Sequence, residues 1–182
     1  MAKKSPVTLA DTTLPPNILA EMERLNAQAA QHHIWLRTRA NAPQKSPWHH
    51  AADEAPSPVP DTRAVSPAPP PVLKPAPYLW KWTDIQPYLL RIAEIAPLEF
   101  TDRQQFLLTN PGLGGALKVT NTIRIAVSIY KSGDFAAQHL HSPNASRTIL
   151  SDAGGYTLIE GEKCLAGRGD LILTPAGTWH GH

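Results

Sequence analysis

Apolar positions follow a helical repeat in the N-terminal part of the chain and a different pattern further on. From Leu14 to Leu36 apolar side chains recur near the helical period, and the two prolines at the start can occupy the first turn. One amphipathic helix is predicted there. A second helix is predicted from about Asp84 to Ala96, where Thr83 and Gln86 have the spacing of a capping box.

After Arg103 the apolar residues occur in short runs separated by glycine-containing turns. Residues 122–130 alternate, which predicts a strand with one apolar face made of Ile123, Ile125, Val127 and Ile129. Further strands are predicted at 148–150, 156–159 and 170–174. Short strands at this spacing indicate a mainly β domain, a sandwich or a barrel.

A proline-rich segment separates the two patterns. The stretch from Pro43 to Pro77 holds 11 of the chain's 19 prolines, mixed with alanine and serine. Such a composition removes backbone donors and leaves little to bury, so a linker or an extended arm is predicted. The chain is thus divided into a helical region at 1–42, the proline-rich arm at 43–77 and a helix with a strand-rich domain at 78–182. The N-terminal helix and the arm are expected to pack on a neighbouring subunit of a homo-oligomer.

Composition narrows the classes of partner. The formal charge of +2 comes from 17 basic and 15 acidic residues spread along the chain, which indicates neither a nucleic-acid face nor a membrane patch. No stretch approaches the roughly 20 apolar residues of a membrane span. The single cysteine, Cys164, fits a reducing compartment and is expected to be a buried strand residue. A cytoplasmic protein that binds a small molecule is predicted.

Three histidines are candidate ligands for one metal ion. His139 and His141 are two positions apart, so on an extended strand both side chains leave the same face. His180 follows a predicted strand and a turn, and a barrel can place that strand beside the first. Three neutral imidazoles leave coordination positions open on a divalent ion, whereas a structural zinc site would close four positions, usually with cysteines.

The spacing around these histidines resembles the two motifs of the cupin superfamily. In the first motif Gly133 precedes His139 by six positions, and in the second Gly169 is followed by Pro175 and then by His180. The resemblance implies a cupin-type β-barrel. The position of the first motif that commonly carries a glutamate is Ser146 here, which favours an all-histidine ligand set.

From Tyr78 to His182 the chain also resembles the gentisate 1,2-dioxygenases and the related salicylate and 1-hydroxy-2-naphthoate dioxygenases. The segments that carry this resemblance are Leu79–Trp82, Thr109–Leu113, His139–Arg147, Gly161–Lys163 and Gly169–Pro175. It implies an enzyme that holds Fe(II), binds a small aromatic hydroxy acid and O2, and cleaves the ring. With gentisate the product would be maleylpyruvate.

The same resemblance suggests which residues contact the substrate. Arg147 matches an arginine that binds the substrate carboxylate, and a guanidinium suits that planar group. His182 matches a histidine beside the substrate, and Arg103 matches a second pocket arginine. Arg124 and Ser128 stand where family members often carry a tryptophan and a glutamine, so a different substrate preference is an open alternative.

The family pattern continues beyond His182 into further strands and a second barrel. The sequence is therefore expected to be an N-terminal fragment whose first barrel is incomplete at the C-terminus. Salicylate or a hydroxynaphthoate remains an alternative substrate, and manganese, nickel, copper or zinc an alternative metal. A non-catalytic cupin that binds a small ligand is the alternative from a different class.

Overall fold

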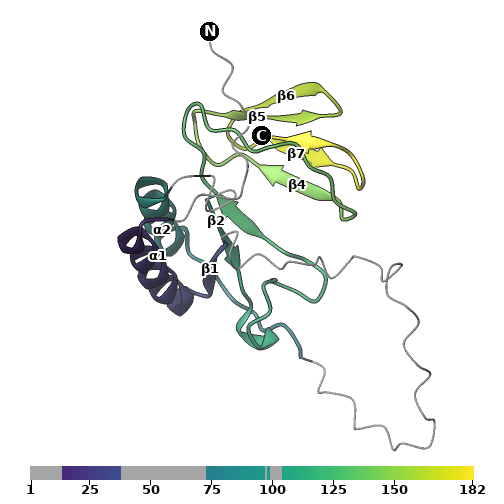
Figure 1. The fold of residues 1–182 in the computed structure, drawn as a ribbon. Helices are drawn as coiled ribbons and strands as arrows, with labels where there is room; N and C mark the ends of the chain where they lie inside the picture. Colours follow the sequence, from purple (N-terminus) through teal and green to yellow (C-terminus); the bar gives the residue numbers. More distant parts are fainter. Residues whose placement is uncertain (1–13, 38–72, 97, 99–103) are drawn as a thin grey trace, which may run out of the picture. The chain divides into compact units, whose positions relative to one another are not determined.

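The computed structural model describes residues 14–37, 73–96, 98 and 104–182, which divide into two compact units. The described residues up to Lys131 form the N-terminal unit, and Ser132–His182 form the C-terminal unit. Figure 1 shows the helices in the first and the pairs of strands in the second. Within the described ranges, no helix is long and apolar enough to cross a membrane.

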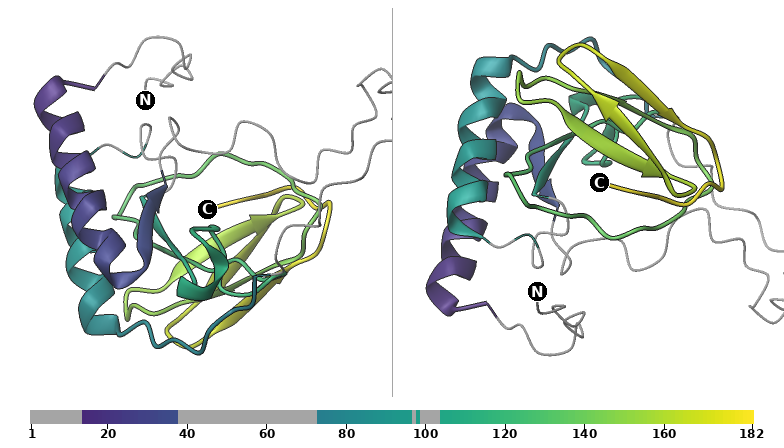
Figure 2. Two further views of the ribbon diagram at one scale, coloured as in Figure 1. Left: turned by 90° about the horizontal axis from the view of Figure 1, so that it is seen from below. Right: turned by 90° about the horizontal axis from the view of Figure 1, so that it is seen from above.

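The N-terminal unit packs two helices against a three-stranded antiparallel sheet. The helices are α1 (Pro16–Ala29) and α2 (Trp82–Ile95), and the sheet has the order β1 (Ile34–Arg37), β2 (Gln105–Leu108), β3 (Ala126–Ser128). Both views of Figure 2 show α1 and α2 lying side by side. One apolar core joins helices and sheet, and its buried members include Met22, Leu25, Leu36, Leu89, Ile92 and Phe106.

The first predicted helix is too long. α1 ends at Ala29, a 3-10 turn η1 follows (Ala30–His32), and His33 reverses the chain with a φ of 54°. Ile34 and Leu36 then lie in β1, each 1% exposed, facing the core. A helical repeat and a strand alternation can place the same apolar residues inward, and pairing with β2 favours the strand here.

The second predicted helix is confirmed, with a different start. α2 begins at Trp82, its N-cap is Lys81, and no side chain caps its first turn. The expected capping box is therefore absent. The Thr83 hydroxyl instead donates to the neighbouring Asp84 carboxylate at 3.4 Å.

The strand predicted at 122–130 forms only over β3. Val119 donates its backbone N–H to the carbonyl of Ile123 at 2.9 Å, so the first part of the expected strand belongs to a tight turn. Ile123 and Ile125 are consequently 53% and 43% exposed, contrary to the predicted apolar face. Val127 and Ile129 do pack against the core, as predicted.

A buried asparagine fixes the loop that follows β2. Asn110 accepts hydrogen bonds from the backbone N–H groups of Ala76 and Gly112, and donates to the carbonyls of Ala76 and Val119. Gly112 lies so close to this segment that a Cβ atom would be 2.3 Å from the carbonyl oxygen of Lys74. Only glycine fits there without moving the backbone.

The C-terminal unit consists of two small antiparallel sheets. One pairs β4 (Ala145–Thr148) with β7 (Leu171–Thr174), and the other has the order β6 (Glu162–Ala166), β5 (Gly155–Ile159), β8 (His180–Gly181). The strands expected at 156–159 and 170–174 are confirmed, and the one expected at 148–150 ends at Thr148.

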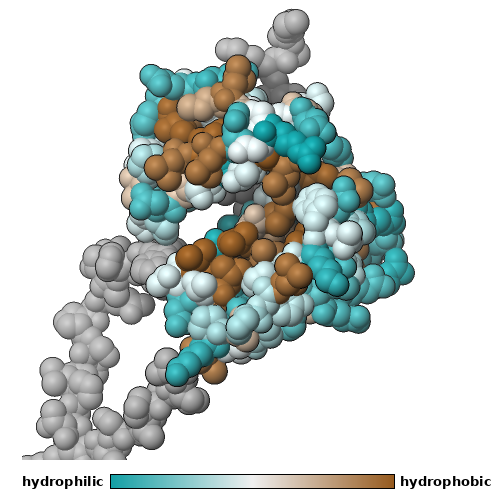
Figure 3. Space-filling model, turned by 180° about the vertical axis from the view of Figure 1, so that it is seen from behind, coloured by the Kyte–Doolittle hydropathy of each residue, from teal (hydrophilic) through white to brown (hydrophobic). Residues whose placement is uncertain are grey.

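The described residues contain no closed barrel, whereas the sequence predicted a cupin-type barrel that is incomplete at its C-terminal end. All sheets within 14–37, 73–96 and 104–182 are open, and with two helices the described part is a mixed α and β structure rather than a mainly β one. On β7, Ile172 and Thr174 are buried whereas Leu171 and Leu173 are 66% and 62% exposed. Figure 3 shows apolar surface, in brown, on the parts of the chain that it colours.

Candidate metal centre

Backbone pairing brings the two histidine segments together. His139 and His180 form an antiparallel bridge in which each N–H donates to the other's carbonyl at 2.9 Å. His180 also begins β8, where it pairs with Ile159 of β5. His141 lies two residues further along, and its carbonyl accepts a hydrogen bond from the N–H of Gly177 at 2.9 Å. The turn before His180 is therefore held against the His139–His141 segment.

The three imidazole rings converge. The ring centroid of His180 lies 4.2 Å from that of His139 and 4.6 Å from that of His141. One nitrogen from each ring can be chosen so that all three lie within 4.8 Å of one another. Nitrogens at neighbouring positions of an octahedral ion, each at about 2.1 Å, are about 3 Å apart, so the rings need to move by about 1 to 2 Å to share an ion. The triad can therefore hold a metal, as the sequence predicted.

Each of these rings is oriented by a backbone carbonyl two residues away. The Nδ1 atoms of His139, His141 and His180 lie 3.1, 2.8 and 2.9 Å from the carbonyl oxygens of Ala137, Pro143 and Thr178, respectively. A carbonyl only accepts hydrogen bonds, so in the neutral rings we assign the hydrogen to Nδ1 and the lone pair to Nε2. Metal-binding histidines are commonly oriented in this way. The lone pair on Nε2 of each ring can then bind a divalent cation.

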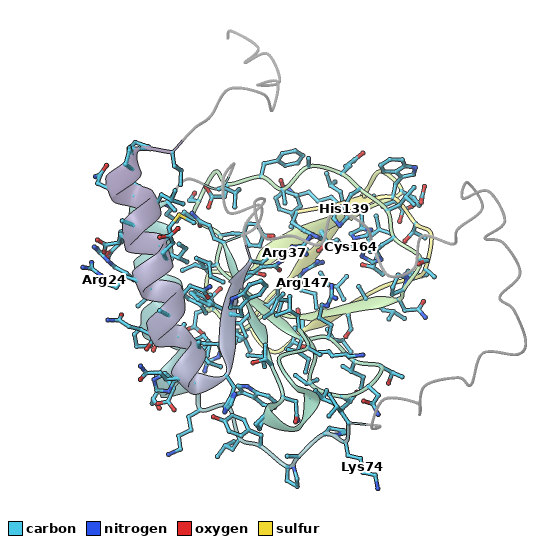
Figure 4. All side chains as sticks on the ribbon, turned by 60° about the horizontal axis from the view of Figure 1, so that its bottom comes forward. Arg24, Arg37, Lys74, His139, Arg147 and Cys164 are labelled. Carbon is cyan, nitrogen blue, oxygen red and sulfur yellow. The ribbon has the colours of Figure 1, made fainter. Side chains whose placement is uncertain are left out.

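A second polar cluster lies beside the triad. Arg147 on β4 donates from Nη1 to the hydroxyl of Thr157 at 2.8 Å and from Nη2 to Nε2 of His182 at 2.7 Å. The ring centroid of His182 is 5.7 Å from that of His180 and 6.1 Å from that of His139. Figure 4 shows His139 and Arg147 in the same region of the C-terminal unit. A cationic fork and a further imidazole thus lie next to the candidate ligands.

Glu160 supports the loop that carries His180. Its backbone N–H donates to the carbonyl of Trp179 at 2.9 Å, and its carboxylate accepts from the N–H of Trp179 at 2.6 Å. On the other side of this loop, Asn144 accepts a hydrogen bond from the N–H of Ala176 at 2.9 Å. Both contacts hold backbone rather than side chains, so they limit the movement of the segment before His180.

Comparison with known proteins gives a consistent result over part of the chain. No protein-family model matches it. A gentisate 1,2-dioxygenase of Ralstonia sp is 40% identical over 107 residues, which cover 58% of this chain and 30% of that enzyme. A 5-aminosalicylate 1,2-dioxygenase of Comamonas sp is 38% identical over 109 residues, 58% of this chain and 29% of the enzyme. Over this part of its length the chain is homologous to gentisate 1,2-dioxygenases.

Solved structures agree with this relationship. The salicylate 1,2-dioxygenase of Pseudaminobacter salicylatoxidans matches with a TM-score of 0.56 and 31% identity, covering 65% of this chain and 33% of that one. Its adduct with gentisate matches over 96% of this chain and 41% of that one, with a TM-score of 0.56 and 25% identity. This chain therefore spans about a third of the length of the proteins it matches.

Three further residues were predicted at the site from the sequence. Arg103 is outside the described residues. Arg124 and Ser128 belong to the N-terminal unit, where Arg124 donates to the carbonyl of Leu117 at 3.1 Å and the Ser128 hydroxyl donates to the Gln105 side chain at 3.4 Å. Their expected part in a substrate pocket stays a prediction. Cys164 lies in a strand, β6, as predicted, but is half-buried rather than buried.

Two residues of the site were not found from the sequence, namely Thr157 and Glu160. Thr157 stands in a predicted strand, where threonine is favoured for its shape alone. Glu160 stands in a predicted turn as one of several exposed acids. The only available signal was their place in those elements, because the contacts that single them out join residues 10 to 25 positions apart.

Proposed function

We propose that this chain supplies the metal-binding part of a ring-cleaving dioxygenase that uses Fe(II) and O2 on a 2-hydroxybenzoate-type acid, with gentisate as substrate and maleylpyruvate as product. The observation that carries the proposal is the cluster of His139, His141 and His180 in a chain that is 40% identical over 107 residues to a gentisate 1,2-dioxygenase. In the complete protein, the open sheets of the C-terminal unit would form part of a cupin-type barrel.

The donor set suits this chemistry. Three neutral imidazoles leave the charge of a divalent ion uncompensated and, in an octahedral ion, three positions vacant. When bound, the ion would act as a Lewis acid that fixes the carboxylate and adjacent hydroxyl of the substrate next to O2. The carbonyl bonds to Nδ1 would leave Nε2 of each ring as the atom that binds the ion.

Arg147 and His182 are the proposed catalytic residues. Arg147 would bind the substrate carboxylate, since its guanidinium is only partly buried and lies beside the triad. His182, 7% exposed, would hydrogen-bond the substrate or the oxygen. Arg147 and His182 are hydrogen-bonded to each other, so the two side chains would contact the substrate together.

A sister enzyme is the first alternative. The relative from Comamonas sp acts on 5-aminosalicylate, and a 1-hydroxy-2-naphthoate 1,2-dioxygenase of Nocardioides sp. is 30% identical over 111 residues. Salicylate or 1-hydroxy-2-naphthoate could thus replace gentisate. Arg124 and Ser128, at positions where the family often has other residues, favour a substrate panel over a single assay. A non-catalytic cupin that binds a small ligand is the alternative from a different class.

Oxygen uptake by the full-length gene product, loaded with Fe(II) under anaerobic conditions, tests the proposal. Uptake is expected with gentisate, and its size relative to salicylate, 5-aminosalicylate and 1-hydroxy-2-naphthoate identifies the substrate. Bound iron with no turnover of any of these acids would favour the non-catalytic alternative and reject the enzyme.

A matched pair of arginine variants tests the site. Arg147→Ala should raise KM for the acid about 10- to 100-fold, as expected for loss of a hydrogen bond to a charged group. Arg168→Ala is the control, because Arg168 is an exposed arginine paired with Asp152 in a turn of the same unit. Equal KM values in the two variants would reject Arg147 as the carboxylate contact.

A further inference from the structure

The hydroxyl of Thr157 is a buried polar group at the centre of the second cluster. Thr157 lies in the middle of β5 and is 0% exposed. It lies within hydrogen-bonding distance of two residues from other segments, Arg147 on β4 and His182 directly after β8. A buried hydroxyl is costly unless it is hydrogen-bonded, and here it bonds both proposed catalytic residues.

The arginine fixes the direction of every bond in this cluster. A guanidinium can only donate, so Oγ1 of Thr157 and Nε2 of His182 are both acceptors from Arg147. With its lone pair on Nε2, the neutral imidazole carries its hydrogen on Nδ1. That Nδ1 lies 3.3 Å from Oγ1 of Thr157, which accepts the third hydrogen bond. The three side chains therefore close a cycle with one consistent set of hydrogens.

This hydrogen-bond cycle fixes the orientation of the His182 ring and the position of the Arg147 guanidinium. If the hydroxyl were absent, Nδ1 of His182 would lose this acceptor and the ring could rotate away from Arg147. Once Nε2 no longer faced that donor, the hydrogen could move to Nε2. Nη1 of Arg147 would lose its anchor at the same time. The side chain that orients both groups is itself fully buried, so it has no exposed surface with which to touch a substrate.

We propose that Thr157 is a positioning residue for the dioxygenase reaction: its hydroxyl holds His182 in the Nδ1–H tautomer and holds Arg147 beside the triad. This inference rests on the proposed function for its kinetic consequence, although the tautomer itself does not depend on turnover. The ligand class that it serves is an aromatic acid whose carboxylate is bound by Arg147.

Two substitutions separate the hydroxyl from the shape of the side chain. Thr157→Val keeps the branched shape that suits β5 but removes the hydroxyl, whereas Thr157→Ser keeps the hydroxyl. In the full-length Fe(II) protein, Thr157→Val should raise KM for gentisate about 10-fold with unchanged iron content, and Thr157→Ser should have a KM within about 3-fold of the parent value. If Thr157 were merely structural, Thr157→Ser, which loses the methyl group, would be as impaired as Thr157→Val, and that result would overturn the proposal.

Nitrogen-15 NMR of histidine-labelled, zinc-loaded protein gives a readout that is independent of turnover. The parent protein and Thr157→Ser should show His182 with its hydrogen on Nδ1, and Thr157→Val should lose this single tautomer. A parent protein with the hydrogen on Nε2 would overturn the proposal even if the Val variant fails to fold. Absence of turnover in a parent with the Nδ1–H tautomer would instead remove the proposed function and leave the hydrogen-bond cycle intact.

Discussion

His180 is the most deeply buried of the three candidate ligands, with 1% of its surface exposed. His180→Ala should lower the affinity of the protein for Fe(II) more than about 100-fold, because loss even of a residue that only orients a ligand costs about 10- to 100-fold. Competition with a chelator under anaerobic conditions measures the change. An affinity within a few-fold of the parent value would show that the triad does not form the metal site.

His32→Ala is the matched control for that experiment. His32 is a histidine of the N-terminal unit that lies against Tyr88, with its Nδ1 3.6 Å from the Asp84 carboxylate. Its replacement should leave the metal affinity unchanged. Circular dichroism of both variants checks that the described helices and strands are retained.

The metal-binding residues could be predicted from the sequence because their spacing matches the two cupin motifs. The convergence of His139, His141 and His180 was predicted from that spacing, and the structure brings their nitrogens within 4.8 Å. Thr157 was not identified, because its contacts come from strand pairing and not from a local pattern. A hydroxyl in a strand has the same sequence signal whether it holds a site together or only suits the pleated backbone.

The turn between β5 and β6 contains a glutamate at a position where glutamate is unusual. Glu160 and Gly161 both have positive φ angles, 48° and 88°, as in a two-residue hairpin turn that usually begins with asparagine or glycine. A glutamate in this conformation costs about 1 kcal/mol or more. The two hydrogen bonds between Glu160 and the backbone of Trp179 offset that cost.

Substitutions at Glu160 should therefore separate stability from metal binding. Glu160→Gly relaxes the backbone but removes the acceptor for the Trp179 N–H, and should weaken metal affinity about 3- to 10-fold. Glu160→Gln keeps an acceptor oxygen and should remain within about 2-fold. If the two variants bind the metal equally, the turn does not position the loop that carries His180.

The α1–α2 pair gives a prediction for pH dependence. Glu21 on α1 forms ion pairs with Arg91 on α2 and with Arg24. The hydrogen bond from Arg91 lowers the pKa of Glu21 below its ordinary value of 4.5, with smaller contributions from the charges of both arginines. The folded state thus favours the ionised carboxylate. The resulting stability is present above about pH 4.5 and is lost as the pH falls through the lowered pKa.

Urea unfolding from pH 6 to pH 3 measures this effect. Glu21→Gln should make the loss of unfolding free energy below pH 4.5 shallower than in the parent, whereas Glu23→Gln on the same helix should leave the slope unchanged. The effect should also shrink in high salt, because the pair is exposed. A parent-like slope in Glu21→Gln would contradict the assignment.

Element boundaries show where sequence patterns reach their limit. The period that predicted one helix over 14–36 also fits a helix followed by β1, and only pairing with β2 distinguishes the two. Similarly, alternation over 122–130 predicted a strand of which only Ala126–Ser128 is formed. Backbone hydrogen bonds between distant segments decided both cases, and no local pattern of apolar residues contains that information.

At the scale of the whole molecule, the sequence predicted a family relationship, a proline-rich arm and a barrel. The relationship to gentisate 1,2-dioxygenases is confirmed over about 58% of the chain. The proline-rich arm at 43–77 lies largely outside the described residues, and the homo-oligomer expected from it stays a prediction. The sheets of the described residues are open, and the incomplete cupin-type barrel expected from the sequence stays a prediction. The chain spans about 30% of the length of these enzymes, so activity has to be measured on the full-length gene product.

The central claim is that three imidazoles share one ion and leave positions on it for an aromatic acid and O2. X-ray absorption of the full-length protein, titrated anaerobically with Fe(II), measures the ligands directly. The account predicts one iron per chain with three imidazole ligands and light-atom ligands that change when gentisate is added. Iron that has fewer than three imidazoles, or that does not respond to any of the hydroxy acids, would contradict it.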